Sequence, residues 1–294
     1  MLPELFSFGP IHLYSFGLMM GIAFLVANYL LVRELRRRQF PNADQIASTV
    51  TLISLAGGII GSKLFSLLEN WSVFIKNPVG EIFSAAGLTF YGGLIVVVIT
   101  LYIYIRRKGI PFLKLADATS PSLIIGYGIG RIGCQLAGDG DYGIPSDLPW
   151  AMGYPNGTVS TLSAHNGELV EKFHQMFPGR PVPADIQVHP APAYETLAAL
   201  AIFALLWSLR KRPMATGKIF GIYLICAGLE RLLVEFIRLN PLYLGLSQAQ
   251  WISVGMIGLG AAILVRLRNA PIEEIPFVTS TTKRPRPAAA KAAR

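Results

Sequence analysis

Apolar runs long enough to cross a lipid bilayer dominate this 294-residue sequence, and they constrain its fold more than any other feature. A transmembrane helix needs about 20 mostly apolar residues. Charged residues make up 15% of the chain, whereas a soluble domain carries roughly 25%. We therefore predict an all-α polytopic membrane protein. Its predicted transmembrane helices, about seven in number, lie at residues 13–32, 47–68, 87–105, 116–136, 191–209, 217–238 and 249–267.

The basic residues predict how these helices are oriented. Most of the 26 lysines and arginines fall in four clusters, within residues 33–38, 106–114, 210–218 and 266–294. Cytoplasmic loops are enriched in Lys and Arg, and only an odd number of spans places all four clusters on one side. We therefore expect the N-terminus outside and the C-terminus in the cytoplasm. Because topology accounts for the net charge of +9, we expect no nucleic-acid partner.

The polar parts of the chain indicate its domain organisation. Residues 137–190, between the fourth and fifth predicted helices, are rich in Pro, Gly, Asn and Asp and predict a small extracytoplasmic lobe with little regular structure. Residues 270–294 form a basic tail that we expect to be disordered, and its charge suits anionic lipid of the inner leaflet. We assign residues 1–269, including the lobe, to a single membrane domain.

The segment Gly126–Gly143 is unusual because it places Arg131 inside an apolar, glycine-rich run and ends in Asp139 and Asp141. A guanidinium group within a membrane costs a few kcal/mol or more, so such a residue indicates a functional site. The segment also matches the glycine pattern of a dinucleotide-binding loop, but no strand precedes it, and we reject that interpretation. The histidines and the two cysteines show no metal-ligand spacing. We expect neither a metal nor an organic cofactor.

A second group of charged residues lies in the sixth predicted helix. Arg231 and Glu235 are one turn apart on the same helix face, and Arg238 follows one turn nearer the outer surface. One interpretation is that Arg231 and Glu235 only neutralise each other within the bundle. The other is that these arginines converge with Arg131 and bind a phosphate, because the planar guanidinium fork matches phosphate oxygens. In a membrane, the abundant phosphate is a lipid headgroup.

These residues also carry a resemblance to the prolipoprotein diacylglyceryl transferase family, which covers nearly all of the chain before the tail. Gly130-Arg-Ile-Gly133, followed by a turn that closes on Gly143, resembles the family signature. Four further matches occur in the family order: Phe90-Tyr-Gly-Gly-Leu94, His189-Pro-x-x-x-Tyr194-Glu195, Arg231-x-x-x-Glu235-x-x-Arg238 and Gln250-x-x-Ser253. The chain departs from the family at Cys134, where the family has Asn, and at Tyr91, where His is frequent.

The resemblance implies a transferase of the bacterial cytoplasmic membrane, multi-pass, with its active site toward the outer face. Its partners would be phosphatidylglycerol, the signal peptide of a preprolipoprotein with its lipobox cysteine, and membrane lipid. The diacylglyceryl group would move to the cysteine thiol, and the products would be a thioether and glycerol phosphate. No cofactor is implied.

The resemblance also implies roles for individual residues. Arg131 and Arg231 would hold the phosphate and offset the charge on the leaving group, with Glu235 orienting Arg231. The base is left open between Tyr91 and the acids Asp139 and Asp141, of which Asp139 is favoured. The residues expected to bind substrate are Arg131, Arg231, Arg238, Gly92, Gly93, Gly133, Gly143 and Tyr194. Tyr194 and Glu195 either line the site or brace the fifth helix.

Two other classes of membrane protein are less well supported. A transporter or lipid-binding protein would use the same arginines, but the sequence shows no convincing internal symmetry, which transporters often have. An intramembrane protease would need a Ser/His or paired-Asp arrangement within the predicted helices, and none is found. Product analysis separates these classes, since a transporter leaves the lipid intact.

Overall fold

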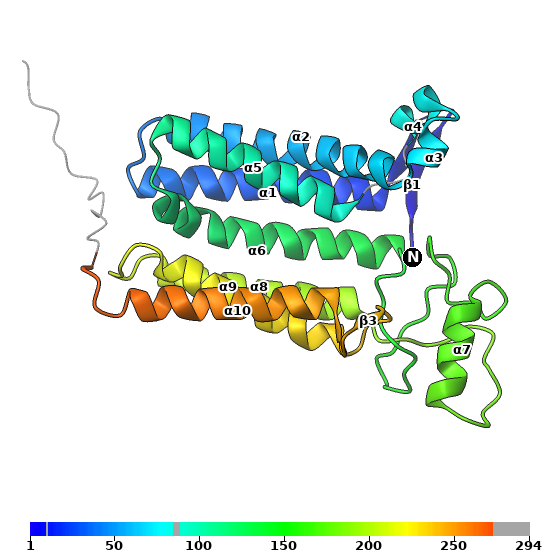
Figure 1. The fold of residues 1–294 in the computed structure, drawn as a ribbon. Helices are drawn as coiled ribbons and strands as arrows, with labels where there is room; N and C mark the ends of the chain where they lie inside the picture. Colours follow the sequence, from blue (N-terminus) through cyan, green and yellow to red (C-terminus); the bar gives the residue numbers. More distant parts are fainter. Residues whose placement is uncertain (10, 85–88, 273–294) are drawn as a thin grey trace, which may run out of the picture.

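The computed structural model describes residues 1–9, 11–84 and 89–272, and its long helices run side by side as a bundle (Figure 1). Within these ranges, seven helices contain 18 or more residues. They are α1 (Ser15–Arg37), α2 (Ala43–Glu69), α5 (Phe90–Lys108), α6 (Phe112–Ala137), α8 (Ala191–Leu209), α9 (Lys218–Glu235) and α10 (Gln248–Arg266). Each overlaps one of the predicted apolar runs, because a helix satisfies its backbone hydrogen bonds without water; residues 87 and 88 of the third run lie outside the described residues.

Four of these helices, α1, α2, α8 and α10, are long and apolar enough to cross a membrane. Charged residues, among them Arg131 and Arg231, interrupt the apolar sequences of α6 and α9. Large apolar side chains such as Leu25, Ile60 and Leu233 are exposed on the bundle, as expected of a surface that faces lipid. The prediction of a helical membrane protein is confirmed, whereas the number of spans and their orientation stay predictions.

Helix α6 is central, because it packs against α1 on one side and against α8 and α9 on the other (Figure 1). Small residues allow these close approaches. A Cβ added at Gly128 would lie 2.9 Å from the Cβ of Ala199 on α8. Helices α2 and α5 meet in the same way, since a Cβ added at Gly61 would lie 2.6 Å from the carbonyl oxygen of Gly92. Such contacts between small residues are typical of helix packing in membranes.

A network of buried charges joins the helices at the end of the bundle that carries the basic clusters. The Glu34 carboxylate of α1 pairs with Arg37 at 2.5 Å and with Arg38 at 3.0 Å, and it lies 3.6 Å from Arg210, which follows α8. Asp117 of α6 accepts hydrogen bonds from backbone N–H groups of residues 217 and 220, at 2.7 and 2.8 Å. Asp117 therefore caps the first turn of α9, whose N–H groups lack partners within the helix.

Short elements complete the end of the bundle opposite to this network. Strands β1 (Glu4–Phe8) and β2 (Ile11–Tyr14) form an antiparallel hairpin that leads into α1. Helices α3 (Trp71–Phe74) and α4 (Pro78–Phe83) follow α2. Strands β3 (Leu242–Tyr243) and β4 (Leu246–Ser247) connect α9 to α10. None of these short strands was predicted.

The predicted lobe, residues 137–190, projects from this same end (Figure 1). It is mostly irregular, as predicted, but it contains one helix that was not predicted, α7 (Gly167–Met176). The Asn166 side chain accepts the Leu169 N–H at 3.0 Å and caps α7. Leu169 and Phe173, one turn apart, are buried in a core with Tyr154 and Val188. This core explains how a short helix forms here. Residues 273–294 of the predicted tail lie outside the described residues.

Candidate functional site

A cluster of arginines and carboxylates lies where the ends of α6, α8 and α9 meet the lobe. Its arginines come from α6 (Arg131), from α9 (Arg231) and from the segment just after α9 (Arg238). We refer to these three residues as the arginine cluster. The prediction that Arg231 and Arg131 converge is confirmed, because both guanidinium groups contact the same carboxylate, that of Glu195.

Glu195 is the centre of this arrangement, and its side chain is completely buried. Arg231 donates a hydrogen bond to Glu195 Oε1 at 2.7 Å, and Arg131 Nε lies 3.1 Å from Oε2. The Tyr127 hydroxyl donates to Oε1 at 2.9 Å, and Arg238 Nη1 lies 3.8 Å from Oε2. A buried carboxylate is tolerated only when cations and donors surround it, and here three arginines do so. The sequence analysis left the role of Glu195 undecided. The available signal was that an acid in an apolar helix needs a cationic partner.

Glu235 completes the inner part of the cluster. Its Oε2 lies 3.0 Å from Arg231 Nη2, and its side chain is 1% exposed. The predicted pairing of Arg231 with Glu235 is therefore confirmed, but mutual neutralisation is not its whole function, because Arg231 also binds Glu195 on α8. Asn240 donates a hydrogen bond to Glu235 Oε1 at 2.5 Å and fixes that carboxylate from the loop after α9.

The prediction that Arg238 continues the helix by one turn is wrong. Helix α9 ends at Glu235, and Arg238 pairs as an antiparallel β-bridge with Gly143. The backbone of the lobe supplies this competing partner, since the Ile144 N–H donates to the Ile237 carbonyl at 2.7 Å. A Cβ at Gly143 would lie 2.5 Å from that same carbonyl oxygen, so only glycine fits there. Gly143 thus acts through the backbone and brings Arg238 to the cluster.

Asp141, in the turn after α6, bridges two members of the arginine cluster. One carboxylate oxygen pairs with Arg131 and the other with Arg238, and Arg238 also donates to the Asp141 carbonyl at 3.1 Å. Burial acts to raise the pKa of Asp141, but the two guanidinium groups outweigh it and hold that pKa below its usual value. With 32% of its side chain exposed, Asp141 is the accessible carboxylate of the cluster.

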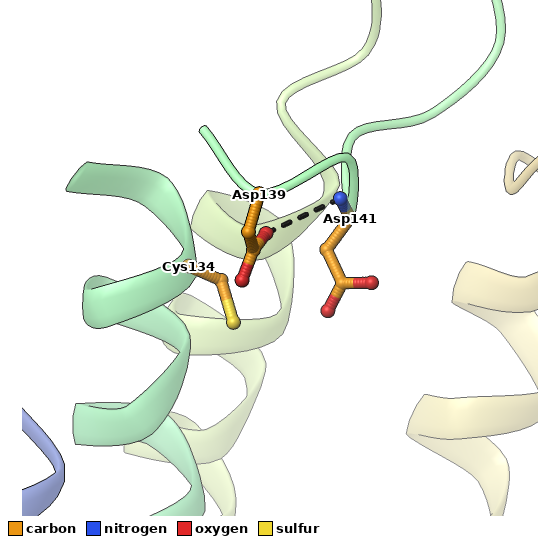
Figure 2. A group of neighbouring side chains, drawn as sticks. All are labelled: Cys134, Asp139 and Asp141. Atoms are coloured by element: carbon orange, nitrogen blue, oxygen red, sulfur yellow. Dashed lines mark hydrogen bonds between the residues drawn. The ribbon is translucent and has the colours of Figure 1, made fainter. Parts of the chain in front are cut away.

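Asp139 and Cys134 lie beside Asp141, as Figure 2 shows. The Asp139 carboxylate accepts the Asp141 N–H at 3.3 Å. Burial, and then the negative charge of Asp141, raise the pKa of Asp139 above its usual value. The Cys134 sulfur and the two carboxylates lie within 4.8 Å of one another, the spacing of metal ligands. Both Asp141 oxygens are already engaged by guanidinium groups, however, so a cation there would face two positive charges. We assign no metal to this group.

Comparison with known proteins shows to which family this chain belongs. The family model described as prolipoprotein diacylglyceryl transferase matches residues 3–266. The chain belongs to this family. Among its relatives is the phosphatidylglycerol--prolipoprotein diacylglyceryl transferase of Clostridium tetani, 32% identical over 88% of this chain and 95% of the relative. The protein of the same name from Bordetella avium is 31% identical over 89% of this chain and 92% of the relative. That from Idiomarina loihiensis is 30% identical over 91% and 93%.

Three of the residues that the family resemblance singled out belong to another helix pair. Tyr91, Gly92 and Gly93 are in the first turn of α5, which packs against α2 and supplies no member of the arginine cluster. A Cβ at Gly92 would lie 2.3 Å from the Cβ of Phe65 on α2. Gly92 therefore sets the distance between two helices, and the expected contact of these three residues with substrate stays a prediction.

The remaining predicted residues surround the cluster without entering it. Gly133 of α6 faces α1, where an added Cβ would lie 3.1 Å from the Cβ of Met19. The Tyr194 hydroxyl accepts a hydrogen bond from Trp150 of the lobe at 2.7 Å and lies 3.3 Å from His189 Nδ1. Tyr194 thus ties the start of α8 to the lobe, immediately before Glu195.

Proposed function

We propose that this family member transfers the diacylglyceryl group of phosphatidylglycerol to the lipobox cysteine of a preprolipoprotein. The observation that carries the proposal is the arginine cluster, in which three guanidinium groups share the buried carboxylate of Glu195. Such an array binds a phosphate in a fixed orientation, because each planar fork is already oriented by carboxylates. The names of the relatives, which specify phosphatidylglycerol and prolipoprotein, supply the donor and the acceptor.

The reaction forms one bond and breaks one bond. The cysteine thiolate attacks the carbon of the diacylglyceryl group that carries the phosphate oxygen, and the C–S bond forms as the C–O bond breaks. The electron pair of that C–O bond leaves with the phosphate, so glycerol phosphate gains negative charge. Arg131 and Arg231 would stabilise this developing charge, which is the usual function of preorganised cations at a reaction centre.

The Asp141 carboxylate occupies the position that we assign to the lipid phosphate. Its carboxylate bridges Arg131 and Arg238 and is far more exposed than that of Glu195 or Glu235. A phosphate offers the same bidentate acceptor geometry to a guanidinium fork. In our proposal the phosphate replaces the Asp141 carboxylate on these two arginines, while Glu195 and Glu235 continue to hold them from the buried side.

The thiol must lose its proton before it attacks, since its ordinary pKa is about 8.5. Asp139 lies beside the cluster, and its raised pKa brings it closer to that of a base working near neutral pH. Tyr91 is the alternative. Its position on α5, in a helix pair that supplies no arginine of the cluster, favours Asp139.

The proposal includes the orientation of the protein. With seven spans, an outer N-terminus and a cytoplasmic C-terminus, the basic clusters face the cytoplasm and the arginine cluster lies toward the outer face of the bacterial cytoplasmic membrane. The lobe, residues 137–190, would then be extracytoplasmic, within a membrane domain of residues 1–269 followed by a cytoplasmic tail, 270–294. Membrane lipid and the preprolipoprotein signal peptide would reach the site from within the bilayer.

The test is product analysis of two arginine variants. Purified protein is incubated with phosphatidylglycerol and a lipobox peptide, and mass spectrometry measures the diacylglyceryl adduct. Arg131→Ala and Arg231→Ala should abolish the adduct while the protein still inserts into membranes. Arg180→Ala is the matched control, because Arg180 pairs with Asp147 on the surface of the lobe, with more than half of both side chains exposed. Full activity in both cluster variants would refute the phosphate-binding assignment.

A further inference from the structure

A half-open cavity of about 660 Å³ lies between helix α7 of the lobe and the end of α9. Its lobe wall is helix α7, which contributes Glu168, Glu171 and Lys172. Its opposite wall is the end of α9 and the segment that follows, including Glu235 and Arg238. The amphipathic sequence of α7 produces this wall, since Leu169 and Phe173 are buried in the lobe core while Glu168 and Glu171 remain exposed.

The cavity begins at the arginine cluster. Glu235 and Arg238 line the cavity and also contact the cluster, where Glu235 pairs with Arg231 and Arg238 with Asp141. The cavity therefore adjoins the cluster at Arg238 and Glu235 and extends from there along α7. The lobe with α7 lies at the end of the bundle next to β3, in the segment that follows α9 (Figure 1).

The size of the cavity favours a stretch of polypeptide over the leaving group. Pockets for drug-sized ligands occupy roughly 300–1,000 Å³, and 660 Å³ lies well inside this range. Glycerol phosphate is far smaller than such a ligand. An extended chain advances about 3.3–3.6 Å per residue, so a few residues beyond the modified cysteine would lie alongside α7.

The charges of the lining oppose an anion. Glu168, Glu171 and Glu235 supply three carboxylates, against the two cations Lys172 and Arg238. Arg238 and Glu235 are already paired within the cluster, so the acids of α7 dominate the outer part. Glycerol phosphate would be repelled here, as would acidic residues of a peptide, whereas basic or neutral residues would be accepted.

We propose that this cavity binds the acceptor polypeptide segment that directly follows the modified cysteine, and that Glu168 and Glu171 select against acidic residues in it. The proposal rests on the transferase function proposed above. It assigns to α7 a role in acceptor specificity, separate from the binding of the lipid.

The test compares two acceptor peptides that are identical up to the cysteine and carry either Lys or Asp at the second and third positions after it. The transfer rate is measured with the full-length protein in phosphatidylglycerol nanodiscs at low ionic strength. Exposed ion pairs contribute up to about 1 kcal/mol each. We expect kcat/KM to favour the Lys peptide by roughly two- to fivefold per charge, and this preference to shrink as salt is added.

Variants of α7 decide whether the cavity causes this preference. Glu168→Gln with Glu171→Gln should bring the ratio close to one, and Glu168→Lys with Glu171→Lys should invert it. The Gln variant keeps the proposal testable if the Lys variant fails to fold. Glu81→Lys, a single charge reversal on α4 outside the cavity lining, is the control and should leave the ratio unchanged.

The remaining outcomes would contradict the proposal, and each shows whether the cavity assignment or the transferase function is wrong. An unchanged ratio in both α7 variants would overturn the assignment of the cavity and leave the transferase function intact. A changed KM for phosphatidylglycerol with an unchanged peptide ratio would mean that the cavity serves the lipid headgroup or the leaving group instead. Absence of adduct on either peptide with the wild-type protein would overturn the proposed function itself.

Discussion

Replacement of Glu195 would separate the structural and chemical functions of the arginine cluster. Its carboxylate is completely buried and contacts Arg231 at 2.7 Å, Arg131 at 3.1 Å and the Tyr127 hydroxyl at 2.9 Å. In Glu195→Ala, Arg131 keeps Asp141 and Arg231 keeps Glu235 as a counterion among the described residues. Breaking a buried ion pair by removing one partner costs about 3–5 kcal/mol. We expect the free energy of unfolding to fall by about that amount.

Glu195→Gln keeps the shape and removes the charge, so its effect is smaller. A hydrogen bond to a charged group contributes about 1.5–3 kcal/mol and a neutral one about 1 kcal/mol. With two arginines affected, we expect a loss of about 2 kcal/mol. Turnover at saturating phosphatidylglycerol should fall at least about tenfold, because small displacements of positioning groups can reduce rates by two orders of magnitude.

The assay pairs denaturant unfolding in detergent with the thioether-forming reaction. Glu230→Gln is the control. Glu230 is also a buried acid, on α9, and its Oε1 lies 3.3 Å from the Tyr127 hydroxyl, which also contacts Glu195. It should therefore lose no more than about 1 kcal/mol. Wild-type stability together with wild-type turnover in Glu195→Ala would refute the central role that we assign to Glu195.

Two further predictions concern other carboxylates. The pKa of Asp141 is lowered in the folded protein. Its ion pairs therefore stabilise the fold fully at pH values above the unfolded pKa of about 3.9. This stabilisation is lost as the pH falls through the lower pKa of the folded protein. In Asp141→Asn, the free energy of unfolding measured from pH 6 to pH 2 should therefore fall less than in the wild-type protein. An equal fall in both proteins would contradict the assignment. Asp117→Ala removes the cap of α9 and its two charge-assisted hydrogen bonds, so it should lower the free energy of unfolding by about 1–3 kcal/mol. Asp44→Ala, which breaks an exposed pair with Arg36, should cost less than about 1 kcal/mol, and equal losses in the two variants would argue against the cap.

Sequence reasoning located the helices well, because long apolar runs are a direct signal. The predicted fifth helix, 191–209, has the same ends as α8. The prediction failed where tertiary contacts decide the end of an element. The sixth helix was expected to reach residue 238, but α9 stops at Glu235, since the lobe backbone at Ile144 pairs with the residues beyond it. The capped helix α7 was also missed, because a single capping Asn and two buried apolar residues are a weak signal.

The sequence predicted only part of the candidate site, again because tertiary contacts decide the rest. Arg131 and Arg231 could be singled out because a charge in an apolar helix is costly wherever it lies. The sequence does not say which carboxylates neutralise them, since Glu195 and Asp141 come from other elements, and Asp141 meets Arg238 across almost a hundred residues. The position of Tyr91 in a helix pair outside the cluster could not be foreseen either, because helix packing determines it.

By itself, the sequence determined that this protein consists of apolar helices with buried arginines, and its motifs indicated the family. These properties depend on composition and short spacing, which are local. Only the tertiary structure decided that Glu195 holds three arginines together, that Asp141 bridges two of them from the accessible side, and that α7 forms a wall of the cavity beside them. These features depend on which helix faces approach each other, and that is decided by close packing at glycines such as Gly128 and by backbone pairing at Gly143.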